Sequence, residues 1–229
     1  MTTYIIDTET TGNVEPQVIE LAWTAVDAGL ELEITQAVSS KRFKPSRPIE
    51  LGAMATHHIQ MDALLDCPSH ETACLPPDTE YIIGHNVDYD WKALGSPDVK
   101  RICTLALAQN LLPTLDTHKL GALIYHFVPS RARELTRHAH EATTDVELCG
   151  LVLEHLLSIL EKRGLSVGSS ERLWQISEAA RIPKIMQFGK YKGEPIELVP
   201  AGWVTWYLKQ TNTDPYLVRA FAAVRKARR

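Results

Sequence analysis

Short apolar runs separated by turn residues organise the first half of the chain. The runs at 4–6, 18–26 and 35–43 are rich in β-branched and aromatic residues, and each predicts a β-strand. A fourth, buried strand is predicted at 81–84. The first three strands follow one another directly, which predicts an antiparallel meander that opens a sheet.

Helical spacing becomes more frequent after these strands. Apolar side chains recur every three or four positions over 50–66, 116–127 and 141–162, which predicts helices with one apolar face. A helical stretch also follows the strand at 81–84, and 102–112 is either a strand or the start of a helix. The longest helix is expected to bury Val146, Cys149, Leu153, Leu156, Leu157 and Leu160. Strands followed by alternating strands and helices indicate an α/β domain of three layers.

A Gly- and Ser-rich segment at 164–170 (GLSVGSS) is expected to be a linker. It divides the chain into a domain at 1–163 and a small C-terminal module at 171–229, for which we expect an α+β extension. The expected elements of the module are a short helix, a strand-like piece at 184–191 and a final helix from about Trp203.

Aromatic residues of this module allow two interpretations. Trp203, Trp206 and Tyr207 stand at helical spacing, which favours the core of a small domain, and we expect Trp206 to belong to that core. The alternative is stacking on nucleic-acid bases, which neighbouring lysines would support. For Tyr191 both interpretations stay open.

Composition narrows the class of protein. Apolar residues make up 45% and charged residues 23% of the 229 residues, as is ordinary for a globular protein. No apolar run approaches the length of a membrane span, and the N-terminus has no secretory pattern. The four cysteines are scattered without a Cys-x-x-Cys pair, which suits a reducing compartment. We therefore expect a cytoplasmic protein.

Charge is distributed unevenly along the chain. Residues 1–180 carry 14 Lys and Arg against 25 Asp and Glu, a net of −11, whereas residues 181–229 carry 10 against 3, a net of +7. An acidic body with a basic tail suggests that catalysis and capture of a polyanion are divided along the chain.

Acidic residues stand at the ends of three predicted elements. Asp7 and Glu9 follow the first strand and precede a Thr-Thr-Gly turn; residues two apart in a strand point to the same face. Two carboxylates placed together repel unless a cation lies between them, and such hard oxygen ligands suit Mg²⁺ or Mn²⁺. Further acids occur in His85-Asn86-Val87-Asp88-Tyr89-Asp90 and in His140-Glu141-Ala142-Thr143-Thr144-Asp145, each at the edge of an apolar element.

The segments DTETTG, HNVDYD and HEATTD resemble the three motifs of the DEDD superfamily of 3′→5′ exonucleases, in the branch whose third motif is His-x4-Asp. This resemblance implies a ribonuclease H-like three-layer fold with a mixed five-stranded sheet. It places the four carboxylates at Asp7, Glu9, Asp90 and Asp145, and the general base at His140. Asp88 and His138 are the rival choices, and the spacing from His138 to Asp145 does not fit the motif.

The resemblance implies phosphodiester hydrolysis with two divalent cations about 3.5–4 Å apart. In the hypothesis that follows, Asp7 is shared by both cations, Glu9 and Asp145 bind the one that activates water, and Asp90 serves the second. His140 accepts the proton of the water, because histidine exchanges protons close to neutral pH.

The expected substrate is the 3′ end of a nucleic acid, with DNA favoured and nucleoside 5′-monophosphates as products. Thr10, Thr11 and Asn86 lie beside the carboxylates and are candidate contacts to the terminal nucleotide, whereas His57 is expected to be a buried structural residue. One alternative is an exoribonuclease of the same superfamily that trims RNA. Another is an inactive nucleic-acid-binding module. The chain shows no membrane partner and no recognisable polymerase tether, and its oligomeric state stays open.

Overall fold

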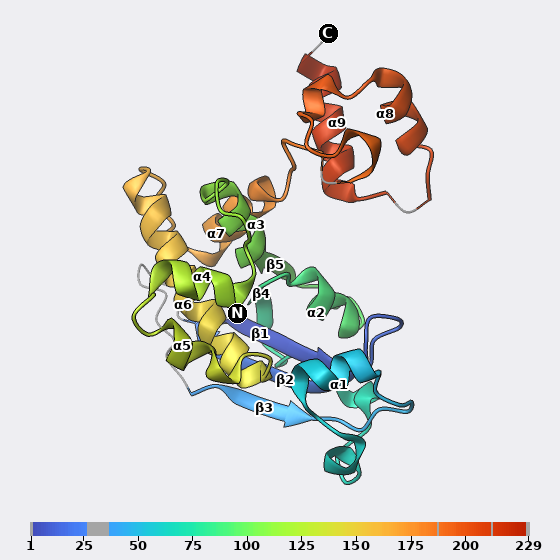
Figure 1. Cartoon of the computed structure of the whole chain (residues 1–229), viewed down its shortest axis with the longest axis vertical. Coiled ribbons are helices and arrows are strands. Elements are labelled where there is room, and N and C mark those ends of the chain that lie inside the picture. Colours follow the sequence, from blue (N-terminus) through green and yellow to red (C-terminus); the bar gives the residue numbers. More distant parts are fainter. Residues whose placement is uncertain (1, 27–36, 187, 212, 228–229) are drawn as a thin grey trace. The chain divides into compact units, whose positions relative to one another are not determined.

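The computed structural model describes residues 2–26, 37–186, 188–211 and 213–227 (Figure 1). The beginning of the strand predicted at 35–43 lies outside these residues. The chain forms two compact units, Met1–Ser177 and Glu178–Arg229. No helix in the described ranges is long and apolar enough to span a membrane.

A mixed five-stranded sheet forms the centre of the first unit, as predicted. Its order is β3-β2-β1-β4-β5, so that the first strand is central. The pairs β1–β2 and β2–β3 are antiparallel, whereas β1–β4 and β4–β5 are parallel. The strands are β1 Thr2–Thr10, β2 Val18–Val26, β3 Ser39–Arg42, β4 Thr79–Gly84 and β5 Lys100–Cys103.

Nine α-helices occur in the described residues. They are α1 Leu51–His57, α2 Asp88–Ala93, α3 Thr104–Leu111, α4 Leu120–Phe127, α5 Ala132–Leu135, α6 Ala142–Lys162, α7 Ser170–Ala180, α8 Ala201–Tyr207 and α9 Pro215–Ala227. Short 3₁₀ turns lie at Met61–Leu64, His70–Thr72, Thr136–His138, Gly189–Tyr191 and Ile196–Leu198.

The longest helix, α6, provides most of the contact between the sheet and its helical cover. It packs against β1, β2, α3 and α4 (Figure 1). The buried side chains of its apolar face include five of the six predicted ones: Val146, Cys149, Leu153, Leu156 and Leu160. This packing holds the first turn of α6 beside the central strand.

One predicted helix is interrupted. The segment 50–66 forms α1 and then a 3₁₀ turn, because His58 adopts a left-handed conformation with φ 59° and ends α1. The ambiguous segment 102–112 contains the end of β5 and the whole of α3.

The first unit extends further along the chain than the sequence predicts. We expected its domain to end at 163 and a linker to end at 170, yet α7 is bonded to the sheet through polar side chains. The Glu171 carboxylate accepts hydrogen bonds from Tyr81 Oη at 2.8 Å and Lys100 Nζ at 2.7 Å. The Ser177 hydroxyl accepts one from the Cys103 amide at 2.8 Å. These bonds join residues up to Ser177 to the first unit.

The second unit has its own apolar core, which consists of Met186, Ile196, Val199, Val204, Tyr207, Leu217, Ala220 and Phe221. Within the described residues of 184–191, the expected strand-like piece is reduced to a single bridge between Ile185 and Pro195, because the chain turns into a 3₁₀ helix at Gly189.

Our prediction that Trp206 belongs to this core is wrong, since 54% of its surface is exposed. The neighbouring Tyr207 is only 6% exposed and takes the inward position. Successive residues of a helix point about 100° apart, so the two rings cannot both face the core.

Ile82 in β4 is completely buried. We expect Ile82→Ala to lower the free energy of unfolding by about 2–5 kcal/mol, because truncation removes apolar contacts and leaves a cavity. Urea denaturation followed by circular dichroism measures this change. Leu51→Ala is the matched control, since Leu51 is 82% exposed, and its effect should stay within about 0.5 kcal/mol. Equal effects of the two substitutions would contradict this account of the core.

Candidate active site

Two of the predicted carboxylates lie on the central strand. Asp7 and Glu9 are both on β1 and, two positions apart, share one face of the sheet. Their partners across the antiparallel pair are Ala22 and Glu20 of β2. Both side chains are partly buried, so the strand holds two acids away from bulk water.

Asp90 joins them from α2. It is only 4% exposed, and its Oδ1 accepts hydrogen bonds from the Thr8 amide at 3.0 Å and the Thr8 hydroxyl at 2.6 Å. Thr8 lies between Asp7 and Glu9, so these bonds attach Asp90 directly to the strand that carries the other two acids.

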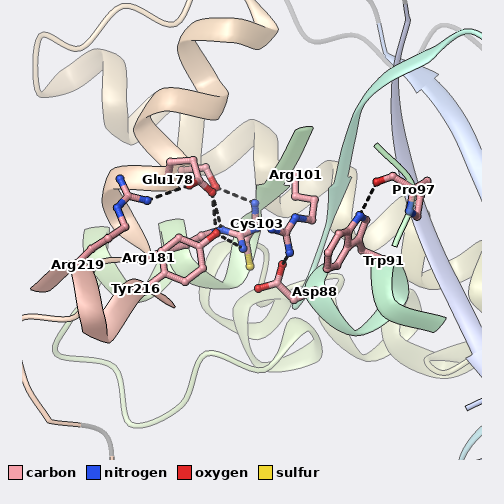
Figure 2. Close-up of polar contacts among 10 residues, drawn as sticks. Asp88, Trp91, Pro97, Arg101, Cys103, Glu178, Arg181, Tyr216 and Arg219 are labelled. Carbon is pink, nitrogen blue, oxygen red and sulfur yellow. Dashed lines mark hydrogen bonds and ion pairs between the residues drawn. The ribbon is translucent and has the colours of Figure 1, made fainter. Parts of the chain in front are cut away.

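The rival Asp88 is engaged elsewhere. Its carboxylate accepts a hydrogen bond from Arg101 Nη1 at 2.6 Å (Figure 2). The Arg101 guanidinium lies 3.9 Å from the centre of the Trp91 ring, and the Trp91 indole donates to the Pro97 carbonyl at 2.8 Å. Asp88 therefore belongs to an ion pair on α2 and β5, which leaves Asp90 as the acid of this segment that faces the strand.

The third segment contributes from the start of α6. Asp145 lies in the first turn of this helix, and its Oδ1 accepts a hydrogen bond from the His140 amide at 3.3 Å. His140 is exposed and adopts a left-handed conformation with φ 72° in the turn before α6. The rival His138 instead pairs through Nδ1 with Glu141 Oε1 at 3.1 Å.

Burial makes each of the four acids harder to ionise, and for Asp7, Glu9 and Asp90 the charges of neighbouring acids add to this effect. Burial raises the pKa of Asp7 well above its usual value, and the charges of Asp90, Asp145 and Glu9 raise it further. Burial, followed by Asp145 and Glu20, raises the pKa of Glu9 to about 8.

The other two acids follow the same direction. Burial raises the pKa of Asp90 to about 7, even though the hydrogen bonds from Thr8 lower it. Burial also raises the pKa of Asp145, against the hydrogen bond from His140. Each acid in this group is therefore costly to ionise without a compensating positive charge.

This donor set fits a hard divalent cation. Carboxylate oxygens are the ligands that Mg²⁺ and Mn²⁺ prefer, and a cation removes the repulsion that raises the pKa values. The hydrogen bonds to Asp90 and Asp145 end on their Oδ1 atoms, so coordination through Oδ2 breaks neither. In the described part of the chain, no group of three or more His, Cys, Asp or Glu side chains is already arranged as a metal cluster.

Two hollows adjoin these acids. A cavity of about 740 Å³ is lined by residues from all three motif segments, including Asp7, Asn86, His140 and Asp145. A second, of about 600 Å³, is lined by Glu20, Arg42, His57, Gln60, Glu141 and Thr143. A substrate in the first cavity has direct access to Asp7, Asp145 and the proposed base.

The candidate substrate residues differ in their surroundings. Thr10 and Thr11 are buried, and their hydroxyls have partners within the fold: Thr10 with Tyr89 and the Gly12 carbonyl, Thr11 with the Gln17 amide at 3.1 Å. Asn86 is exposed in a left-handed conformation with φ 73°. His57 is 5% exposed, as predicted, and its Nδ1 accepts from the Ile59 amide at 3.0 Å.

Sequence reasoning missed the pair Glu20 and Arg42. Glu20 of β2 stands directly across from Glu9, and its side chain is 8% exposed. Arg42 Nε donates to its Oε1 at 3.0 Å, which gives this fifth acid a positive partner. Only the strand register brings these residues to the site, so no local motif signals them.

The chain is similar to known nucleases in its sequence and in its fold. No family model matches the chain. It is 28% identical over 220 residues to exodeoxyribonuclease 10 of Escherichia coli strain K12, with 91% of each chain covered.

Solved structures of exonucleases have a fold similar to that of this chain. Exonuclease X in complex with 5′ overhanging duplex DNA matches with a TM-score of 0.54 and 25% identity, covering 75% of this chain and 99% of that chain. The nuclease domain of 3′hExo, a DEDDh family member bound to rAMP, matches with a TM-score of 0.55 and 13% identity over 72% of this chain and 94% of its own, which shows the fold. In its fold, its motif residues and its relatives, the chain is therefore similar to exonucleases of the DEDD superfamily, exonuclease X among them.

Proposed function

We propose that this protein is a 3′→5′ exonuclease that hydrolyses DNA from single-stranded or frayed 3′ ends and releases nucleoside 5′-monophosphates. The relatives support DNA as substrate: one is an exodeoxyribonuclease over 91% of its length, and exonuclease X is in complex with duplex DNA. The four free cysteines fit the reducing cytoplasm that the sequence predicts.

One observation carries the proposal: four acids from three distant segments meet around β1, each with a raised pKa. Acids with strongly raised pKa values occur more often at functional sites than elsewhere in a protein. The neighbouring cavity of about 740 Å³ has space for a nucleotide beside them.

The chain's own residues divide the work of hydrolysis. Asp7, Glu9, Asp90 and Asp145 would hold two divalent cations, Mg²⁺ or Mn²⁺, which when bound neutralise the phosphate and acidify water. His140 lines the same cavity as Asp7 and accepts the proton of the attacking water. Asn86, on the wall of that cavity, and Thr10 and Thr11, through backbone groups, position the terminal nucleotide.

Asp90→Asn and Asp88→Asn form a matched pair two residues apart. We expect Asp90→Asn to slow hydrolysis of 3′-labelled single-stranded DNA by about 100-fold or more, because it removes a ligand charge. Asp88→Asn should change the rate only a few-fold, since Asp88 is paired with Arg101. Time courses on labelled DNA and matched RNA, with Mg²⁺ or EDTA, measure both.

Stepwise loss of nucleotides from the 3′ end of DNA is the expected pattern. Faster trimming of RNA would assign the same chemistry to the exoribonuclease alternative. A wild-type protein that binds DNA but hydrolyses neither polymer would identify the inactive binding module instead.

The two histidines near the third motif provide another matched pair. We expect His140→Ala to lower the turnover number by about 100-fold or more, as general-base removal does, with little change in DNA binding measured in EDTA. His138→Ala should leave turnover almost unchanged, because that ring pairs with Glu141 away from the cavity. Comparable losses in both variants would refute the assignment of the base.

The raised pKa values predict how stability depends on pH without metal. Between pH 6.5 and 8 the folded state retains protons on Glu9 and Asp90 that the unfolded state has lost, so stability falls as pH rises. Below that window His85, whose pKa burial lowers to about 4, acts in the opposite direction.

We therefore expect the melting temperature in EDTA to fall from pH 6.5 to pH 8, and to fall less in Glu9→Gln. Added Mg²⁺ should raise it more at pH 8, where the ligands are more readily ionised. Differential scanning fluorimetry checks this, and a melting temperature that rises across the window in EDTA would count against the buried acids.

A further inference from the structure

A group of aromatic rings lies at one surface of the second unit. We define the aromatic cluster as Phe188, Tyr191, Trp203 and Trp206. Trp203 is its centre, with ring centroids 6.5 Å from Phe188, 5.7 Å from Tyr191 and 5.7 Å from Trp206. Beneath it, Tyr207 stacks on Trp203 at 5.4 Å with an interplanar angle of 8°.

Two of these rings are exposed although the unit's core is complete beneath them. Trp206 is 54% and Phe188 is 43% exposed, whereas Tyr207 and Phe221 below are almost fully buried. Large aromatic side chains stabilise a fold strongly when they are buried. Two that stay exposed to solvent on a unit of about 50 residues therefore suggest a ligand-binding face.

The backbone turn at Gly189 positions part of the cluster. Gly189 has a φ of 71°, which favours glycine, and a Cβ added there would lie 4.0 Å from Trp203 Cζ2. The backbone therefore passes close to the Trp203 ring, with Phe188 just before the turn and Lys190 just after it. Glycine at this position lets both side chains reach the same surface.

Positive charge accompanies these rings. Lys190 Nζ lies 5.6 Å from the centre of the Tyr191 ring, and Lys192 is exposed one residue further on. Lys209 follows Trp206 by three residues, just beyond the end of α8. Residues 181–229, which form all but the first three residues of this unit, carry a net charge of +7, against −11 for residues 1–180, so attraction for a polyanion is concentrated here.

We propose that the aromatic cluster is a base-stacking platform, and that the second unit binds single-stranded nucleic acid with it. Exposed rings stack on bases of any sequence, while lysines beside them contact the phosphates. This charge complementarity favours a nucleic acid over an apolar protein segment as the occupant. The inference rests on the proposed function in one respect: the strand bound is the substrate of the exonuclease.

Binding of a fluorescein-labelled oligothymidylate of about 20 nucleotides to the full-length protein in EDTA tests the platform. We expect Trp206→Ala with Phe188→Ala to weaken binding by about 10- to 100-fold, measured by fluorescence anisotropy. Trp206→Phe should retain most of the affinity, because the stacking face remains. Leu198→Ala is the control, since Leu198 is 65% exposed in the same unit and should not affect binding.

The salt dependence of binding tests the charged part of the platform. Lys190→Gln with Lys192→Gln should reduce the slope of log affinity against log salt by about 1.4, since each phosphate contact on a single strand contributes about 0.7. An unchanged slope would show that these lysines do not contact phosphates.

A second assay separates this proposal from the proposed function. Hydrolysis of the p-nitrophenyl ester of thymidine 5′-monophosphate with Mn²⁺ requires only the proposed active site of the first unit, so the Trp206 and Phe188 variant should retain it. If the wild-type protein does not hydrolyse the ester, the exonuclease assignment is refuted, but the binding result is not affected. Full affinity for oligothymidylate in the aromatic variant, with its circular dichroism unchanged, would overturn the platform. Sedimentation that shows dimers of wild type but not of the variant would identify a second copy as the occupant.

Discussion

The burial of neighbouring carboxylates is the constraint on which the rest of this structure depends. Burial raises the pKa values of Asp7, Glu9, Asp90 and Asp145, and repulsion from neighbouring acids raises those of Asp7, Glu9 and Asp90 further. Such an arrangement lowers the stability of the metal-free fold. The acids stay in this arrangement because the sheet and two helices fix the backbone at all three segments. A divalent cation bound to the acids would neutralise their repulsion and stabilise the fold.

The supporting contacts follow from this constraint. Thr8 donates two hydrogen bonds to Asp90, which fixes α2 against the central strand. Asp145 is in the first turn of the 21-residue helix α6, where the positive end of the helix dipole favours a carboxylate. Glu20 adds a fifth negative charge across from Glu9 and raises the pKa of Glu9, although its own carboxylate is paired with the guanidinium of Arg42.

The same constraint explains the distribution of charge along the chain. A site made of acids, within a segment of net charge −11, attracts cations but repels the phosphates of a substrate. In our proposal, the second unit, which is basic and exposes aromatic rings, supplies the attraction for phosphates that the acidic site lacks.

The sequence alone predicted the acids of the candidate site and determined much of the fold. Asp7 and Glu9 at the end of an apolar run predicted a shared face, because strand periodicity is local, and the apolar positions of α6 followed from helical periodicity. Motif spacing selected Asp90 rather than Asp88, and His140 rather than His138, as the candidate site residues. In the structure, Asp88 pairs with Arg101 and His138 with Glu141.

Only the tertiary structure decided the features that depend on contacts between distant segments. The pairing of Glu9 with Glu20 requires the register of β1 against β2, which no local pattern specifies. The extension of the first unit to Ser177 depends on bonds from α7 to β4 and β5. The exposure of Trp206 depends on which side of α8 faces α9 and the turn before it. Helical spacing identifies an apolar face, but only packing determines which of two neighbouring aromatic rings it buries.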